Sequence, residues 1–174
     1  ETMRLNALAS SFLDLARLES GRVQFRKTLF SIADLMYECK DVMASKAVED
    51  NIQIRVESPE GLPLLEADRD KIKQVLLNLL SNAIKYNRPS GTVMLRAEAS
   101  ETGMVIYVQD TGIGIPEEAL PHLFQKFYRV REHESKSSGT GLGLSICKQI
   151  VQGHGGRMEV KSKVAVGTVF SVIL

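Results

Sequence analysis

The sequence has no excess of charge of either sign, no long apolar run and few cysteines. Lys and Arg total 22 against 21 Asp and Glu, so the net charge of +1 gives no electrostatic reason to expect nucleic acid as a partner. No apolar run approaches the ~20 residues of a membrane span, and no signal-peptide pattern opens the sequence. We therefore expect a cytoplasmic protein, with any membrane anchor of the full-length molecule outside this sequence.

The two cysteines, Cys39 and Cys147, lie far apart and do not have the spacing of metal ligands. Buried free thiols in a reducing compartment are the favoured interpretation. Hydrophobic residues make up 44% and charged residues 25% of the 174 positions, which is ordinary for a soluble globular protein. This length suffices for one domain with a sizeable core plus an appendage.

Residues 1–20 predict the appendage, a helix with a narrow apolar seam of coiled-coil type and Gly21 as its stop. The seam consists of Leu5, Leu8, Phe12, Leu15 and Leu18. It either docks on the chain's own domain or forms one arm of a helical hairpin or dimer bundle, and the polar remaining sides favour the second. The sequence opens inside this helix, so we expect a piece of a longer protein, divided into a hairpin helix at 1–21 and a domain at 22–174.

The rest of the sequence alternates between helix and strand patterns separated by turn residues. Ser31 and Asp68 suit the N-caps of two helices. The expected elements are a strand at 23–30, a helix at 31–48, a strand at 52–57, a long helix at 68–87, a strand hairpin at 92–99 and 104–110, a short helix from 117, a loop without periodicity at 129–139, a helix to about 152, and strands near 157–162 and 168–174. We expect an α+β fold, a two-layer sandwich with helices on one face of a mixed, largely antiparallel sheet.

The helix expected at 68–87 has two contrasting faces. Its apolar face contains Ile72, Val75, Leu76, Leu79, Leu80, Ala83 and Ile84. Beside it, Asn78, Asn82 and Lys85 fall within about 60° of each other on a polar stripe. Asn is a mediocre helix former, so two of them one turn apart suggest a function. An ordinary solvated surface stripe is the alternative for this helix taken alone.

Two glycine-rich segments predict ligand contacts. In DTGIGI, residues 110–115, an acidic residue ends an apolar strand, and its carboxylate could select an exocyclic amine such as that of adenine. A capped turn is the alternative. In GTGLGLS, residues 139–145, backbone N–H groups and the start of a helix converge in the manner of a phosphate site. This second segment matches neither a P-loop nor a Rossmann fingerprint, and a flexible hinge is its alternative.

Combined with these segments, the polar stripe is suited to hold Mg²⁺ beside a triphosphate. Mg²⁺ takes oxygen ligands, and Asn amide oxygens supply them without adding negative charge. Lys85 and Arg129 could neutralise phosphate oxygens, and loop 129–139 would act as a lid that orders over nucleotide.

The motifs NLLSNAIKY, DTGIGIP, FQKFYR and GTGLGLSICKQIV resemble the N, G1, F and G2 boxes of sensor histidine kinases, in the family's order. The resemblance covers about residues 66–174 and extends to the ATPase group with the Bergerat fold, which includes gyrase-type, Hsp90-type and MutL-type proteins. In addition, LDLARLESG at 13–21 resembles the end of the family's second dimerisation helix.

The resemblance assigns expected roles to individual residues. It implies Mg²⁺ ligation by Asn78 and Asn82, and catalysis by Asn78, Lys85 and Arg129, with Arg129 at the γ-phosphate. Base recognition is implied for Tyr86, Asp110, Gly112, Gly114, Ile115 and the weaker candidate Thr168. Further ATP contacts are implied for Gly139, Thr140, Gly141, Leu142, Gly143 and Leu144, and anchoring of the lid for Phe124 and Phe127.

One position separates the kinases from their hydrolytic relatives. Those relatives carry Glu where this sequence has Asn78, and Glu acts as a general base toward water whereas a neutral amide cannot take the proton. Transfer to another nucleophile is therefore favoured over hydrolysis. In the family that nucleophile is a His on the first dimerisation helix, but His122, His133 and His154 do not lie in its HELRTP-like context.

We therefore expect the ATP-binding catalytic domain of a sensor histidine kinase, acting with ATP and Mg²⁺. Its expected partners are an acceptor-His helix outside this sequence and a response regulator. The full-length protein is expected to be a homodimer and this piece a monomer or weak dimer, because the seam of residues 1–20 lacks its hairpin mate. An ATP-binding pseudokinase-like module and a hydrolytic ATPase are the alternative functions.

Overall fold

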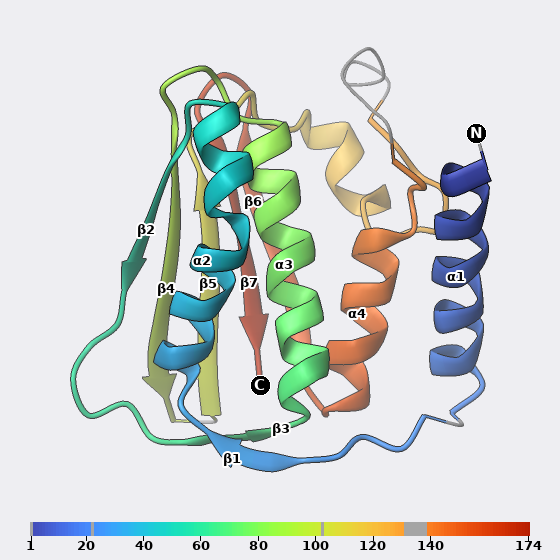
Figure 1. Ribbon diagram of the computed structural model, residues 1–174, viewed down its shortest axis with the longest axis vertical. Helices are drawn as coiled ribbons and strands as arrows, with labels where there is room; N and C mark the ends of the chain where they lie inside the picture. Colours follow the sequence, from blue (N-terminus) through green and yellow to red (C-terminus); the bar gives the residue numbers. More distant parts are fainter. Residues whose placement is uncertain (1, 22, 102, 131–138) are drawn as a thin grey trace.

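The computed structural model describes residues 2–21, 23–101, 103–130 and 139–174, with side chains from residue 9 onward (Figure 1). The segment 131–138, which contains His133 and most of the expected lid, lies outside the described residues. The elements are α1 Thr2–Glu19, β1 Thr28–Phe30, α2 Ile32–Glu49, β2 Gln53–Glu57, β3 Leu65–Ala67, α3 Arg69–Lys85, β4 Thr92–Ser100, β5 Gly103–Asp110, the 3₁₀ helix η1 Glu117–His122, α4 Gly143–Gly153, β6 Arg157–Lys163 and β7 Gly167–Ile173.

The main sheet has five strands in the order β2-β4-β5-β7-β6. β2 pairs with β4 in parallel, and the other neighbouring pairs are antiparallel. α2, α3 and α4 lie together on one face of this sheet (Figure 1). The expected two-layer α+β sandwich with a mixed, largely antiparallel sheet is confirmed.

α3 is the central helix, and its sequence explains why. Asp68 caps its start, with the side-chain Oδ1 accepting a hydrogen bond from the Lys71 backbone N at 3.1 Å. Its neighbours on the helical layer are α2 and α4. All seven residues of the expected apolar face are buried, namely Ile72, Val75, Leu76, Leu79, Leu80, Ala83 and Ile84. The polar stripe is therefore left on the side that faces away from the core.

The expected strand at 23–30 is wrong in extent, because β1 contains only Thr28–Phe30. The residues before it make tertiary contacts instead of ladder bonds. The centres of the Phe25 and His154 rings lie 4.4 Å apart, and the Arg26 backbone N donates to Asp68 Oδ2 at 2.9 Å. β1 pairs antiparallel with β3, a three-residue strand that the sequence did not predict because it is too short for periodicity.

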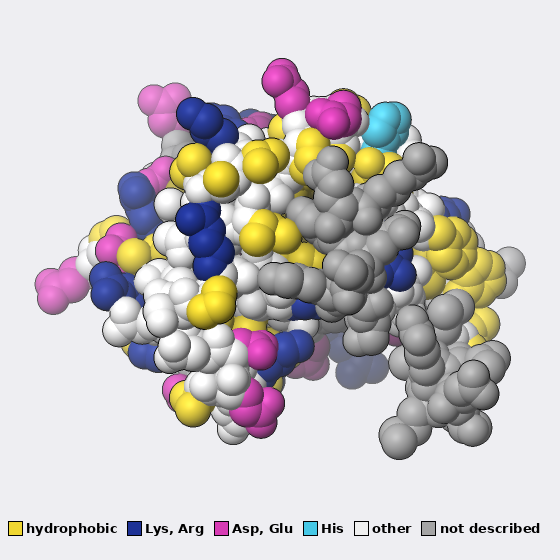
Figure 2. Space-filling model, turned by 90° about the horizontal axis from the view of Figure 1, so that it is seen from above, with side chains coloured by type: hydrophobic (Ala, Val, Ile, Leu, Met, Phe, Trp, Pro, Cys, Tyr) yellow, Lys and Arg dark blue, Asp and Glu magenta, His cyan; other side chains and the backbone are white. Residues whose placement is uncertain are grey.

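Part of the expected α1 seam docks on the chain's own domain, while the side chains of Leu5 and Leu8 lie outside the described residues. α1 lies beside α4, and Leu15 is buried there with 1% of its surface exposed (Figure 1). Glu19 also forms an ion pair with Lys126 at 2.7 Å. Phe12 and Leu13, however, are 50% and 55% exposed, and hydrophobic side chains gather at this edge of the molecule in Figure 2. Among the described residues, no helix is long and apolar enough to cross a membrane.

Candidate functional site

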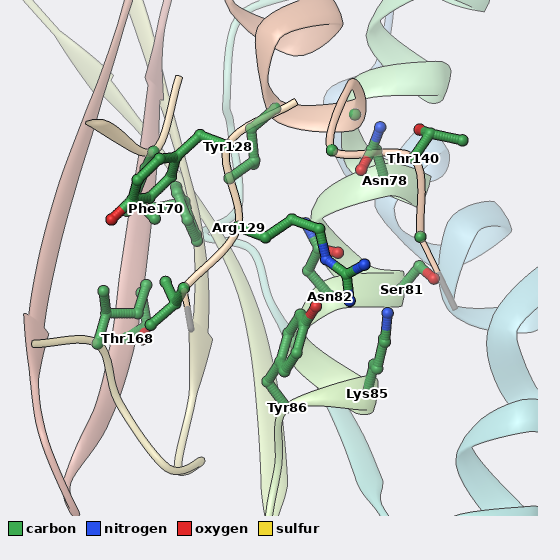
Figure 3. Close-up of a pocket in the computed structure, with 18 of the residues that line it drawn as sticks. Asn78, Ser81, Asn82, Lys85, Tyr86, Tyr128, Arg129, Thr140, Thr168 and Phe170 are labelled. Carbon is green, nitrogen blue, oxygen red and sulfur yellow. The ribbon is translucent and has the colours of Figure 1, made fainter. Parts of the chain in front are cut away.

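A cleft of about 480 Å³ opens between α3, the end of β5, the start of β7 and the segments that precede α4 (Figure 3). The described residues that line it are Ser11, Lys46, Gln74, Asn78, Ser81, Asn82, Ala83, Lys85, Tyr86, Asp110, Gly114, Ile115, Leu123, Tyr128, Arg129, Val130, Gly139, Thr140, Gly141, Gly143, Leu144, Ile146, Thr168 and Phe170.

Asp110 stands at the end of β5 and is buried at one end of the cleft. Its Oδ1 accepts hydrogen bonds from the Gly112 backbone N at 2.8 Å and the Thr168 backbone N at 3.2 Å. Both of these bonds end on Oδ1 and neither uses Oδ2. The strand end and the two N–H groups thus hold the carboxylate in one orientation.

Burial raises the pKa of Asp110 from its ordinary 3.8 to about 6, against the smaller opposing effect of the hydrogen bonds from Gly112 and Thr168. A carboxyl whose pKa rises on folding binds protons more tightly in the native state. Ionisation of Asp110 therefore lowers the free energy of unfolding by ~3 kcal/mol above pH 6, and this loss vanishes below pH 4.

This shift predicts a pH dependence of stability. As the pH rises from about 4 to about 6, the free energy of unfolding of the ligand-free chain should fall through Asp110 by ~3 kcal/mol. The measurement is urea unfolding across this range for the wild-type chain and Asp110→Asn, because subtraction cancels the other titrating groups. Parallel pH curves for the two proteins would contradict the prediction.

The glycines of the 110–115 segment permit close backbone packing. Gly114 has φ +73°, and a Cβ there would lie 2.1 Å from the Lys163 carbonyl oxygen. A Cβ at Gly112 would lie 2.3 Å from the Tyr86 carbonyl oxygen. A larger residue would therefore push this segment away from its neighbours on both sides.

The polar stripe of α3 forms the opposite wall. Asn78, Ser81, Asn82 and Lys85 come from successive turns of the helix and point into the cleft (Figure 3). Lys85 Nζ lies 5.0 Å from the centre of the Tyr86 ring. Arg129 reaches across from the segment that follows η1, and its guanidinium lies near Asn82 in the view of Figure 3.

The glycine-rich start of α4 closes against this wall. A Cβ at Gly143 would lie 2.6 Å from Asn78 Oδ1, so a larger residue there would displace the Asn78 amide from its present position. Gly141 has φ +69°, and its carbonyl accepts a hydrogen bond from the Phe127 backbone N at 2.9 Å. The segments 124–130 and 139–143 are thereby joined through their backbones.

Four residues expected at the site do not line the cleft: Gly112, Phe124, Phe127 and Leu142. Gly112 and Leu142 are buried behind the surface, with Leu142 fully in the core. Phe124 packs edge-on against Phe170 with ring centres 6.4 Å apart, whereas the Phe127 side chain is 54% exposed. The Phe127 backbone contacts the glycine-rich segment through its hydrogen bond to Gly141.

Several lining residues were missed by sequence reasoning. Ser81 lies one helical turn from Asn78, so the stripe itself could have indicated it. Phe170 lies two residues after Thr168 on β7 and shares its face of the sheet. Tyr128 and Ile146 had no periodic signal that pointed to a ligand.

The charges of the cleft are separated. Asp110 is the only carboxylate among the described lining residues, whose cations are Lys46, Lys85 and Arg129, and Lys85 and Arg129 lie with the amides of α3. This arrangement suits a ligand with an amine at one end and anionic groups at the other. The described residues contain no cluster of three His, Cys, Asp or Glu able to hold a metal. Amide oxygens from Asn78 and Asn82 fit a hard cation that takes its remaining ligands from phosphate.

Residues 67–174 match the family described as histidine kinase-, DNA gyrase B- and HSP90-like ATPase. The chain belongs to this family. Its similarity within the family is to the sensor histidine kinases, as the relatives below make plain.

Two curated relatives are similar over nearly the whole chain. The circadian input-output histidine kinase CikA of Synechococcus elongatus is 36% identical over 168 residues, which is 95% of this chain and 22% of that protein. The sensor protein SrrB of Staphylococcus aureus is 33% identical over 175 residues, covering 100% of this chain and 30% of SrrB. The chain thus spans less than a third of the curated relatives it matches.

Solved structures agree with this placement. The catalytic domain of histidine kinase ThkA is 32% identical with a TM-score of 0.72, and the match covers 87% of this chain and 96% of that one. Full-length ShkA in complex with AMPPNP is 30% identical with a TM-score of 0.86, over 96% of this chain and 35% of ShkA. The chain is therefore a catalytic domain of the histidine kinase type.

Proposed function

We propose that the cleft binds ATP with Mg²⁺, and that the γ-phosphoryl group passes to an imidazole nitrogen of a His on a dimerisation helix outside this sequence and then to an Asp of a response regulator. The observation that carries this proposal is the charge separation of the cleft. With Asp110 as the only carboxylate among the described lining residues, the phosphate end holds no general base for water.

The base of ATP would occupy the end of the cleft at Asp110. Its exocyclic amine is a donor, and a carboxylate accepts only. Tyr86, Ile115, Ile146 and Phe170 also line the cleft and supply apolar surface on which a base could pack. Thr168 borders the same space, and its Oγ1 lies 2.8 Å from Ser162 Oγ.

The triphosphate would lie along α3 toward the start of α4. Asn78 and Asn82 would hold Mg²⁺ through their amide oxygens, and the metal would neutralise phosphate charge. Lys85 and Arg129 would bind phosphate oxygens, with backbone N–H groups of the 139–143 segment on the other side.

Transfer breaks the bond between the γ-phosphorus and the bridging oxygen of ADP, and a P–N bond to the imidazole forms. The chain's own residues act by holding the phosphates in line with the nucleophile and by balancing charge. Asn78, a neutral amide, would not activate water, so the γ-phosphoryl group awaits a nucleophile from outside this sequence.

Two relatives support the ligand and partner classes. ShkA was solved with AMPPNP, and ThkA was solved with the response regulator TrrA, the latter 26% identical to this chain with a TM-score of 0.74. By similarity we propose ATP and a response regulator for this chain, and residues 1–21 as the end of a dimerisation helix.

The test of the proposed transfer mixes the chain with a separate dimerisation hairpin that carries the acceptor His, in the presence of radiolabelled ATP and Mg²⁺. The expected result is acid-labile, base-stable label on the hairpin, lost when its His is replaced. Steady release of phosphate over many turnovers would favour a hydrolytic ATPase instead. ATP binding without label or release would leave a binding module.

The assembly of this piece is a separate prediction. Because α4 covers part of the α1 seam and only the rest is exposed, we expect a monomer or a weak dimer, since the area left for a second copy is small. Light scattering over a concentration series measures it. A tight dimer at low micromolar concentration would contradict the prediction.

A further inference from the structure

Arg88 lies just beyond the C-cap of α3, after Tyr86 and Asn87, and its side chain crosses to two segments that are distant in the sequence. Its Nε and Nη2 donate to the Gly112 carbonyl oxygen at 3.2 and 3.0 Å. Nη2 also donates to the carbonyl oxygen of Ala165, in the turn between β6 and β7. One guanidinium thus joins the end of α3, the 110–115 segment and the β6–β7 turn.

Arg88 holds the carbonyl of Gly112, the residue whose N–H contacts the Asp110 carboxylate. Gly112 is buried, its N–H donates to Asp110 Oδ1 at 2.8 Å, and its carbonyl accepts from Arg88. The Gly112 N–H and carbonyl belong to consecutive peptide groups that meet at its Cα, so Arg88 acts on the N–H by restricting the φ and ψ angles of Gly112. Loss of the guanidinium would leave a buried carbonyl without this partner.

The β6–β7 turn is held by the same network. Ala165 has φ +63°, an uncommon conformation for a residue with a Cβ, and its N–H donates to the Ile113 carbonyl at 2.9 Å. The Ile113 N–H donates to the Tyr86 carbonyl at 3.1 Å. The 112–114 backbone is therefore tied to α3 on one side and to the turn on the other, and Arg88 spans both.

Asn87 fixes the point from which Arg88 departs. Its side chain is buried, its Oδ1 accepts from the Arg88 backbone N at 2.9 Å, and its Nδ2 donates to the Thr92 carbonyl at 3.2 Å. The Thr111 hydroxyl also donates to Asn87 Oδ1 at 3.3 Å. The start of the Arg88 side chain is thus held to β4 and to the residue after Asp110.

We infer that Arg88 is a positioning residue for base recognition, acting through Gly112 on Asp110 without lining the cleft itself. The inference rests on the proposed binding of ATP. A base site held in its binding geometry before the ligand arrives binds more tightly, because less ordering is required on binding. Arg88 should therefore act at the base end of the cleft and leave the phosphate end unchanged.

The test compares Arg88→Ala with the wild-type chain by calorimetric titration against Mg²⁺–ATP, Mg²⁺–GTP and Mg²⁺–tripolyphosphate. The expected result is an ATP affinity about tenfold lower, a smaller ratio of ATP to GTP affinity, and a tripolyphosphate affinity within about twofold of wild type. Arg88→Lys should recover part of the loss, because an ammonium group can still donate to one carbonyl. Arg157→Ala is the matched control, since Arg157 is exposed and pairs with Glu159 on its own strand.

Amide hydrogen exchange supplies a readout that needs no nucleotide. In Arg88→Ala the Ile113 and Ala165 amides should exchange at least about tenfold faster, whereas amides of the α3 core should not change. Unchanged exchange, unchanged ATP affinity or an equal loss of ATP and tripolyphosphate affinity would overturn the inference. If Arg88→Ala does not fold, Arg88→Lys decides by the same criteria. A folded wild-type chain that binds neither ATP nor tripolyphosphate would overturn the proposed function, while the exchange measurement would still report on the Arg88 contacts.

Discussion

Asp110→Asn should weaken ATP binding by about 10- to 100-fold while making the ligand-free chain more stable. The carboxylate of Asp110 is buried with 8% of its surface exposed, and burial raises its pKa to about 6. At pH 7 the native state therefore carries a buried charge at a cost of ~3 kcal/mol. Asn removes the charge and keeps an oxygen to accept from Gly112 and Thr168, so the melting temperature should rise by roughly 6 to 12 °C.

The affinity should fall because the adenine amine would meet a neutral amide instead of a carboxylate. Hydrogen bonds to charged groups contribute about 1.5–3 kcal/mol, which corresponds to this loss. Calorimetric titration and thermal unfolding at pH 7 measure the two effects on the same samples. Asp41→Asn, at an exposed position of α2, is the control that changes the net charge equally.

The informative outcome is that Asp110→Asn raises the stability of the chain while it lowers the affinity for ATP. If Asp110→Asn binds ATP as tightly as the wild-type chain, then Asp110 does not read the base. If the variant loses stability as well as affinity, the two backbone hydrogen bonds of Asp110 matter more to the fold than the desolvation of its charge, and the large upward pKa shift is wrong.

Asn82→Ala should abolish Mg²⁺-dependent nucleotide binding, with a loss of at least ~100-fold. Asn82 is proposed as a direct Mg²⁺ ligand, and changes even to outer-shell partners of bound metals typically cost 10–100-fold in affinity. The fold should survive, because Ala is the best helix former and Asn82 lies on the polar stripe rather than among the buried residues of α3.

Titrating the protein with ATP, once in Mg²⁺ and once in EDTA, separates the metal's contribution to the affinity from that of the nucleotide. The variant should lose the gain in affinity that Mg²⁺ gives and should match the wild-type chain in EDTA. Gln109→Ala is the control, because it removes an exposed amide from β5 away from the cleft. Wild-type Mg²⁺ dependence in Asn82→Ala would remove Asn82 from the metal site.

The sequence alone determined those features that local periodicity and side-chain chemistry encode. The apolar face of α3 was predicted residue for residue, because a 3.6-residue period and a capping Asp68 leave one possible inward side. The β4–β5 hairpin and the helix after the glycine-rich segment were predicted for similar reasons. The cleft-facing positions Asn78, Asn82 and Lys85 followed from the polar stripe.

Only the tertiary structure decided which distant segments meet. The cleft needs β7 beside β5, a pairing that places Thr168 opposite Asp110 and that no local pattern encodes. Phe25 lies against His154 instead of continuing the strand expected at 23–30. The seam of α1 is partly buried against α4 and partly exposed to solvent. Arg88 had no motif to mark it, because its partners are carbonyl oxygens, and a backbone carbonyl carries no residue identity that a sequence could show.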